Sequence, residues 1–144
     1  MKKSTPAFLV EFVSIEDIKK KLITANIQPT AQRIAICKYT FTKGLHTTAE
    51  SIKKWADDHF PTICLATVYN TLNALVKAGL LKELKFSDSE KSIYDNNLAE
   101  HYHFFDEKSG EIMDLYSPQI KLSHKLPKQF QIRRVDILLT GEKI

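Results

Sequence analysis

The stretch of sequence that decides the fold lies between residues 65 and 79 and reads Leu65-Ala66-Thr67-Val68-Tyr69-Asn70-Thr71-Leu72-Asn73-Ala74-Leu75-Val76-Lys77-Ala78-Gly79. Its apolar residues recur three and four positions apart, which predicts a helix that begins at Thr62 or Cys64 and stops at Gly79. The stripe expected to face the core consists of Leu65, Val68, Leu72, Leu75 and Val76. The opposite face is small and polar. It is either a plain solvated face or a surface that can enter the major groove of DNA and hydrogen-bond base edges.

Three further helices are expected upstream of this one. The first covers residues 15–25 with Ser14 as its N-cap, the second covers residues 30–41, and the third is capped by Thr47 or Thr48. Downstream, residues 80–86 and 91–94 are typical of two short strands joined by the turn Ser87-Asp88-Ser89-Glu90. Helices followed by a β-hairpin in this order indicate a winged helix-turn-helix domain over residues 1–95.

A hairpin that carries two histidines opens the second expected unit, which covers residues 96–144. In the run Glu100-His101-Tyr102-His103-Phe104-Phe105, strand alternation places both imidazoles on one face. If Asp106 pairs with Glu111 across the turn, His103 lies directly opposite Asp114, with Cβ atoms about 5 Å apart. Two imidazoles and a carboxylate then converge as the outline of a metal site. The alternative is a polar hairpin face with chance histidines.

The rest of the second unit is expected to hold a short helix and a final strand. The helix would be entered through Ser117-Pro118 and stopped by Pro127, and the strand would run from Phe130 to Leu139. Val135, Ile137 and Leu139 alternate along that strand. The fold class is therefore α+β, with a winged helix-turn-helix followed by a small α/β domain.

Composition narrows the possible functions. The 144 residues include 43% hydrophobic residues, enough for a packed core, and the net charge of +4 falls within the first 95 residues, which permits nucleic-acid binding. The sequence has no apolar run that could cross a bilayer and no signal-peptide pattern, so a cytoplasmic protein without a membrane partner is expected. Cys37 and Cys64 lie far apart in apolar contexts, and we expect both to be buried.

Four separated motifs together resemble the ferric uptake regulator (Fur) family. They are Pro29-Thr30-Ala31-Gln32-Arg33, His46-Thr47-Thr48-Ala49-Glu50-Ser51-Ile52, Leu65-Ala66-Thr67-Val68-Tyr69-Asn70-Thr71-Leu72 and His101-Tyr102-His103. The resemblance covers the chain from about Ile15 to its end. It implies a homodimeric, metal-dependent repressor that binds double-stranded DNA at an A·T-rich palindromic operator. The second unit would then be the dimerisation and metal-sensing domain.

The resemblance also implies roles for individual residues. The ligands of one regulatory metal site per chain match His46, Asp95, His101, His103 and Asp114. This nitrogen and oxygen set suits Fe(II) or Mn(II). Tyr69 and Asn70 match positions that the family uses for base contacts, with Thr67 and Thr71 beside them. Arg33 and Lys77 are candidates for contacts with DNA phosphates.

Departures from the family pattern indicate one of its branches. The structural zinc of the family uses two Cys-x-x-Cys pairs, but Asp106 and Ser109 stand at the first pair and the chain ends near the second, so we expect no structural zinc. Asp114 stands where iron uptake regulators usually have Glu. Asp at this position, with Asn70 after Tyr69, looks like the peroxide-responsive branch, called PerR. That branch implies oxidation of ligand histidines by peroxide at a bound Fe(II), at positions that match His46 and His101.

Three other interpretations are possible. The nearest is a Fur-like iron, manganese or zinc uptake regulator without peroxide reactivity. The second is a non-haem iron enzyme or a cupin-like hydrolase built on the His-x-His strand. Such an enzyme needs a closed substrate pocket and leaves the helix-turn-helix unexplained, so we expect no enzymatic activity. The third is a metal-independent DNA-binding protein with a vestigial site.

Overall fold

A computed structural model describes residues 13–42, 46–85 and 91–144 and divides the chain into two compact units. The first unit ends at Leu98 and the second begins at Ala99. Within the described residues, no helix is long and apolar enough to span a membrane.

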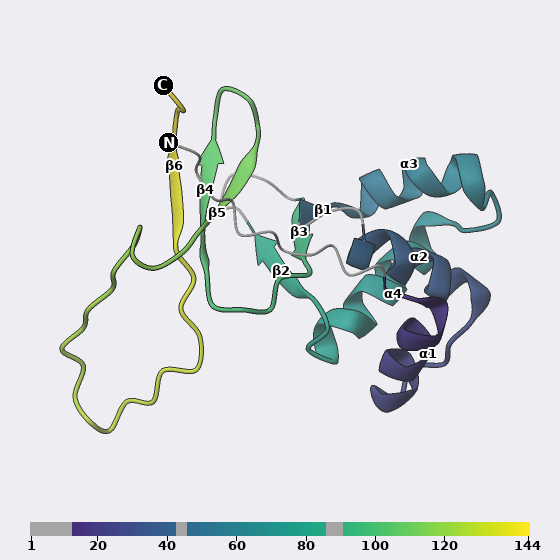
Figure 1. The fold of residues 1–144 in the computed structure, drawn as a ribbon, viewed down its shortest axis with the longest axis horizontal. Coiled ribbons are helices and arrows are strands. Elements are labelled where there is room, and N and C mark those ends of the chain that lie inside the picture. Colours follow the sequence, from purple (N-terminus) through teal and green to yellow (C-terminus); the bar gives the residue numbers. More distant parts are fainter. Residues whose placement is uncertain (1–12, 43–45, 86–90) are drawn as a thin grey trace. The chain divides into compact units, whose positions relative to one another are not determined.

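Four helices build most of the first unit (Figure 1). They are α1 (Ile15–Thr24), α2 (Ala31–Thr42), α3 (Ala49–His59) and α4 (Leu65–Lys77). Side-chain caps determine where two of them begin. Ser14 accepts the N–H of Asp17 at the start of α1, and Thr48 forms a reciprocal capping box with Ser51 at the start of α3. All four predicted helices are therefore confirmed, with ends that shift by at most three residues.

The core of the first unit lies between these helices. Ile18, Ile36, Ile52, Leu72 and Leu75 are each 0% exposed. The predicted stripe of α4 is correct apart from Leu65, which is 39% exposed because it is the first residue of the helix. Thr71 instead joins the buried stripe, being 1% exposed, because it lies three residues after Val68 and four before Leu75.

A three-stranded antiparallel sheet completes the first unit. Its strands are β1 (His46–Thr47), β2 (Lys82–Lys85) and β3 (Ser92–Asp95), in the order β1-β3-β2. The predicted hairpin is thus confirmed, although its turn at residues 86–90 lies outside the described residues. Strand β1 was not predicted, because two residues are too few to show alternation. It pairs His46 with Asp95 across the sheet.

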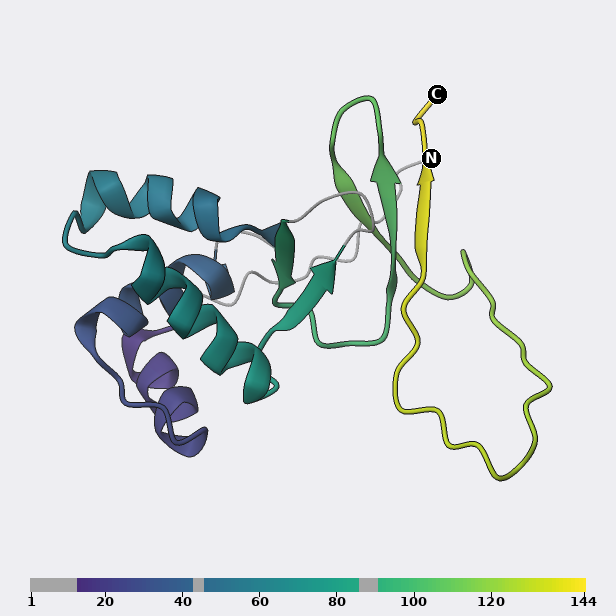
Figure 2. The ribbon, with the colours of Figure 1, turned by 180° about the vertical axis from the view of Figure 1, so that it is seen from behind.

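The second unit is a smaller sheet of β4 (Tyr102–Asp106), β5 (Ile112–Leu115) and β6 (Leu138–Gly141). Its order is β5-β4-β6, with β4 antiparallel to β5 and parallel to β6, as seen in Figure 2. The backbone N–H of Asp106 donates to the Glu111 carbonyl, and His103 lies opposite Asp114. The register predicted from the sequence is therefore confirmed.

Two predictions for the second unit are wrong. The structure has no helix between residues 117 and 127, where a turn at Gln119 is followed by irregular chain. So short a segment between two prolines cannot offset the cost of starting a helix. The final strand covers residues 138–141 instead of 130–139, because within one chain β4 offers a pairing partner only from about Ile137 onward.

The turn between β4 and β5 is held by one buried carboxylate. Asp106, which is 4% exposed, accepts hydrogen bonds from the Ser109 hydroxyl at 2.8 Å and the Lys108 backbone N–H at 3.0 Å. The Ser109 hydroxyl, with the backbone N–H groups of Lys108, Ser109 and Lys143, holds the pKa of Asp106 below its usual value against the opposing effect of burial. The carboxylate therefore joins the turn to the segment after β6.

We expect Asp106→Asn to destabilise the protein at neutral pH. Because the folded pKa of Asp106 lies below the value of about 3.9 for an unfolded aspartate, ionised Asp106 stabilises the fold above that pH. This contribution is lost as the pH falls through the folded pKa. Thermal unfolding of the full chain between about pH 7 and about pH 3 should show a smaller decline for Asp106→Asn than for the wild type.

Glu107→Gln is the matched control for this experiment, because it removes an adjacent but exposed carboxylate. It should unfold like the wild type across the same range. Parallel pH profiles for Asp106→Asn and the wild type would contradict the role given to Asp106.

Candidate metal centre and nucleic-acid interface

Three side chains of the second unit bring their metal-binding atoms together. His101 and His103 present Nε2 atoms 3.0 Å apart, and each Nε2 lies 3.5 Å from Asp114 Oδ1. Both side chains are buried, with 0% of His101 and 9% of His103 exposed. His101 lies just before β4, and His103 is the second residue of that strand. Asp114 lies on β5, directly opposite His103. The cluster predicted from strand alternation and register is therefore present.

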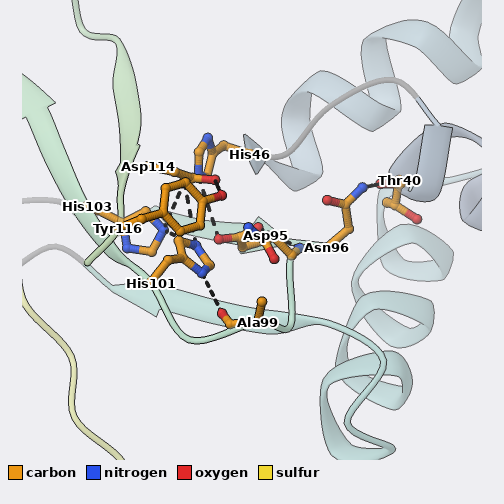
Figure 3. Close-up of polar contacts among 10 residues, drawn as sticks. Thr40, His46, Asp95, Asn96, Ala99, His101, His103, Asp114 and Tyr116 are labelled. Carbon is orange, nitrogen blue, oxygen red and sulfur yellow. Dashed lines mark hydrogen bonds and ion pairs between the residues drawn. The ribbon is translucent and has the colours of Figure 1, made fainter. Parts of the chain in front are cut away.

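The backbone determines the tautomer of His101. Its Nδ1 faces the carbonyl oxygen of Ala99 (Figure 3), and the two atoms are 2.7 Å apart. A carbonyl only accepts hydrogen bonds, so Nδ1 carries a proton, and in the neutral ring Nε2 then carries the lone pair directed at the cluster. This is the arrangement by which proteins commonly orient a histidine that binds a metal.

Tyr116 also supports the cluster. Its hydroxyl donates to Asp114 Oδ2 at 3.2 Å, and its ring lies 5.8 Å from that of His101 (Figure 3). Tyr116 was not among the site residues predicted from the sequence. Its position two residues after Asp114, on the same face, is the signal that could have identified it.

The first unit contributes a second pair of candidate ligands. His46 Nε2 lies 3.6 Å from Asp95 Oδ2, because strands β1 and β3 place the two residues opposite each other. Asp95 is 0% exposed, and its Oδ1 accepts the backbone N–H of Asn97 at 2.8 Å. Asn96 anchors the same segment to α2 by donating to the Thr40 carbonyl at 2.9 Å (Figure 3).

The geometry of the cluster in the second unit fits a transition-metal ion. Ligands at right angles around one ion, each at about 2.1 Å, lie about 3.0 Å from one another. The separations of 3.0 and 3.5 Å agree with ligands on one face of an octahedron. Imidazole and carboxylate donors without a thiolate suit Fe(II), Mn(II) or zinc, so the residues present fit the metal that the family pattern implies.

The outer face of α4 presents the residues predicted to contact bases. Tyr69 and Asn70 are exposed, and the Tyr69 hydroxyl donates to Glu50 Oε1 of α3 at 3.0 Å. This hydrogen bond raises the pKa of Tyr69. The pKa of Glu50 is lowered first by its own backbone N–H and then by Tyr69. Glu50 was missed in the sequence analysis, because no local pattern links residues 19 positions apart.

The other candidate DNA contacts differ in their exposure. Lys77 is exposed at the end of α4, and the Arg33 guanidinium donates to the Gln28 carbonyl at 3.0 Å. Thr67 is half-buried at the start of α4, and its hydroxyl lies 3.3 Å from Cys64 Sγ. Thr71 is buried, so its side chain does not belong to the outer face of the helix.

The two cysteines have different environments. Cys37 is 0% exposed, and burial raises the pKa of its thiol to about 12 despite the opposing charge of Arg33. Cys64 is exposed at the N-cap of α4, so the prediction that both cysteines are buried is wrong for Cys64. The Thr67 hydroxyl and nearby backbone N–H groups lower the pKa of Cys64.

The fold and the two sites define a winged-helix protein with a cluster of histidine and aspartate side chains on its second sheet. Comparisons with known proteins agree with this class. The model of the ferric uptake regulator family matches residues 24–140. A peroxide-responsive repressor, PerR, from Staphylococcus epidermidis is 38% identical over 106 residues, which cover 74% of this chain and 70% of that protein.

Solved structures show the same fold. The ferric uptake regulator from Pseudomonas aeruginosa with manganese aligns with a TM-score of 0.69 at 20% identity and covers 88% of this chain and 97% of its own. A PerR structure from Streptococcus pyogenes, described in terms of peroxide sensing and gene regulation, aligns with a TM-score of 0.52 at 26% identity and 90% coverage of both chains. The chain therefore belongs to the ferric uptake regulator family, whose members are transcriptional regulators and not enzymes.

The contrast between the two thiols can be measured by alkylation. Because the thiolate is the reactive form, iodoacetamide should modify Cys64 far faster than Cys37 in the folded protein. Mass spectrometry of peptides from a time course distinguishes the two sites. In Cys64→Ser, Cys37 should stay unmodified until denaturant is added. Equal labelling of both thiols in the folded wild type would contradict the burial of Cys37.

Proposed function

We propose that this chain is a metal-dependent DNA-binding repressor that senses peroxide through the histidines that bind its metal. The observation that carries the proposal is the buried cluster of His101, His103 and Asp114, in which the Ala99 carbonyl directs the lone pair of His101 inward. Membership of the ferric uptake regulator family supports the metal-dependent repressor. Peroxide sensing is our more specific proposal.

We propose one regulatory metal site per chain, with Fe(II) or Mn(II) held by His46, Asp95, His101, His103 and Asp114. Zinc or copper would bind such ligands more tightly, so the supply of metal in the cell must contribute to the choice. His46 and Asp95 belong to the first unit and the other three to the second. A metal held by all five would select one relative orientation of the units, by its differential affinity for that orientation.

Peroxide sensing is supported by the nitrogen and oxygen atoms available to bind the metal and by the similarity to peroxide-responsive relatives. If each of the five residues supplied one ligand atom, a bound Fe(II) would still have room for a further oxygen ligand. Bound Fe(II) would supply one-electron reactivity towards peroxide, which Mn(II) provides far less readily. Relatives named as peroxide-responsive repressors are 36–38% identical to this chain. We place the oxidation-sensitive ligands at His46 and His101, whose modification would weaken metal binding and release the DNA.

The proposed DNA target is an A·T-rich palindromic operator read by two copies of α4. Asn70 can bond the N6 and N7 atoms of adenine, and Tyr69 can contact thymine methyl groups. Arg33, Thr67 and Lys77 would contact the DNA beside them. A homodimer is supported by exposed apolar side chains in the second unit, namely Leu122, Leu126, Phe130, Ile132 and Val135. We further propose that the protein acts in the cytoplasm, where DNA is available, and carries no structural zinc.

DNA binding should require the metal and depend on the outer face of α4. Mn(II) should be needed for salt-sensitive binding to an A·T-rich palindrome, measured by fluorescence anisotropy. Tyr69→Ala and Asn70→Ala should each weaken operator binding by about 1–3 kcal/mol and leave metal binding unchanged. Lys77→Ala is the matched control, because loss of a phosphate contact should weaken operator and random DNA alike. Metal-independent binding to the operator would contradict the proposed function.

Peroxide sensing is tested by mass spectrometry of the metal-loaded protein. Brief peroxide treatment of the Fe(II) form should add oxygen to a peptide that contains His46 or His101 and release DNA, whereas the Mn(II) form should resist both changes. Asp114→Glu should keep metal-dependent DNA binding but react less, because the longer carboxylate can occupy the position left open for peroxide. Oxidation confined to Cys64 or Cys37, with the histidines intact and the DNA released, would contradict the metal-centred mechanism.

A further inference from the structure

A polar pocket of about 250 Å³ lies between the start of α2 and the side of α4. Six of the residues that line it are Gln28, Thr30, Arg33, Thr67, Asn70 and Thr71. They offer hydroxyl groups, amides and one guanidinium. None of the described residues that line the pocket carries a carboxylate. The chemistry of this lining favours an anion with several oxygen atoms.

The N-terminus of α2 faces the same pocket. Thr30 caps this 12-residue helix by accepting the backbone N–H of Arg33 at 3.3 Å. The first turn of any helix leaves backbone N–H groups without helical partners, and the helix dipole adds positive potential there. Anions bind readily at such positions, and phosphate groups are the commonest example.

Thr71 is an independent sign that the pocket takes a ligand. Its side chain lines the pocket and is 1% exposed, yet its hydroxyl oxygen has no hydrogen-bond partner among the residues that the structure describes. A buried hydroxyl without a partner destabilises a protein, because the hydrogen bonds it made to water in the unfolded chain are not replaced. Thr40, by contrast, is equally buried but donates its hydroxyl to carbonyl groups of its own helix.

We propose that this pocket binds one phosphodiester group of the DNA backbone, with the Thr71 hydroxyl as a buried donor to a phosphate oxygen. The inference rests on the proposed DNA-binding function. Asn70 lines the pocket and is also exposed on the outer face of α4, so a phosphate held there lies beside the helix that reads the bases. Contacts of this kind fix the position of a reading helix on the duplex without recognising sequence.

The main test compares Thr71→Val with Thr40→Val, two substitutions that each remove one buried hydroxyl and keep the side-chain shape. Thr71→Val should weaken binding to operator and random DNA by the same factor of about tenfold, which is typical of a lost hydrogen bond to a charged group. Thr40→Val should bind both DNAs like the wild type. Unchanged DNA binding by Thr71→Val would overturn the proposal.

Thermal unfolding without DNA separates a binding role from a structural one. Thr71→Val should unfold at the same temperature as the wild type or higher, because it removes a buried polar group that lacks a partner. A lower unfolding temperature together with weaker DNA binding would show that Thr71 acts through the fold, and would overturn the proposal.

Two further experiments show whether the bound phosphate belongs to DNA or is a free anion. Operators in which single phosphates are replaced by neutral methylphosphonates should reveal one position per half-site that weakens the wild type and leaves Thr71→Val unaffected. Inorganic phosphate should stabilise the free wild-type protein only weakly. Strong, Thr71-dependent stabilisation by inorganic phosphate, with no sensitive DNA position, would assign the pocket to a free anion and overturn the proposal.

The wild type distinguishes failure of this inference from failure of the proposed function. If metal-loaded wild type binds the operator while Thr71→Val does so equally well, only the phosphate pocket is wrong. If metal-loaded wild type does not bind DNA, the proposed repressor function is wrong as well.

Discussion

The close approach of two imidazole nitrogens and a carboxylate oxygen is the interaction on which the second unit depends. Two imidazole nitrogens and a carboxylate oxygen that lie 3.0 to 3.5 Å apart favour a proton or a metal cation among them. The backbone imposes this approach, since the register of β4 and β5 places His103 opposite Asp114. The Ala99 carbonyl then fixes His101, so the unit holds the donors in a geometry suited to a metal.

Hydrogen bonds of Asp106 hold the far end of the same hairpin. Asp106 and Ser109 stand where the family pattern has its first zinc-binding cysteine pair, and their side chains are hydrogen-bonded to each other. The Asp106 carboxylate also reaches the backbone N–H of Lys143, beyond β6. One buried carboxylate thus joins the turn between β4 and β5 to the segment after β6. Charge-assisted hydrogen bonds of this kind depend on pH, whereas a pair of thiolates depends on metal and redox state.

In the first unit, the position of α4 in the core decides which of its residues can meet DNA. Val68, Thr71, Leu72 and Leu75 face inward, which leaves Tyr69 and Asn70 exposed on the other side. The hydrogen bond between Tyr69 and Glu50 limits the freedom of the tyrosine ring. In the proposed DNA complex, this restriction would reduce the entropy cost of binding. The same packing buries the Thr71 hydroxyl beside the start of α2. This hydroxyl is therefore buried without a hydrogen-bond partner, which lowers the stability of the free protein. A bound phosphate would supply the missing partner.

The sequence by itself determined the four helices, the winged hairpin and the pairing of His103 with Asp114. These features follow from local rules, because helical spacing, capping residues and strand alternation act within a few residues of one another. Only the tertiary structure decided the strand at His46, the contact between Glu50 and Tyr69, and the pocket beside Thr71. Each of these joins residues far apart in the chain, and the partner of such a residue is chosen by packing. The missing helix and the displaced last strand after Tyr116 have the same cause, because a short segment adopts regular structure only when a neighbour pairs with it or covers it.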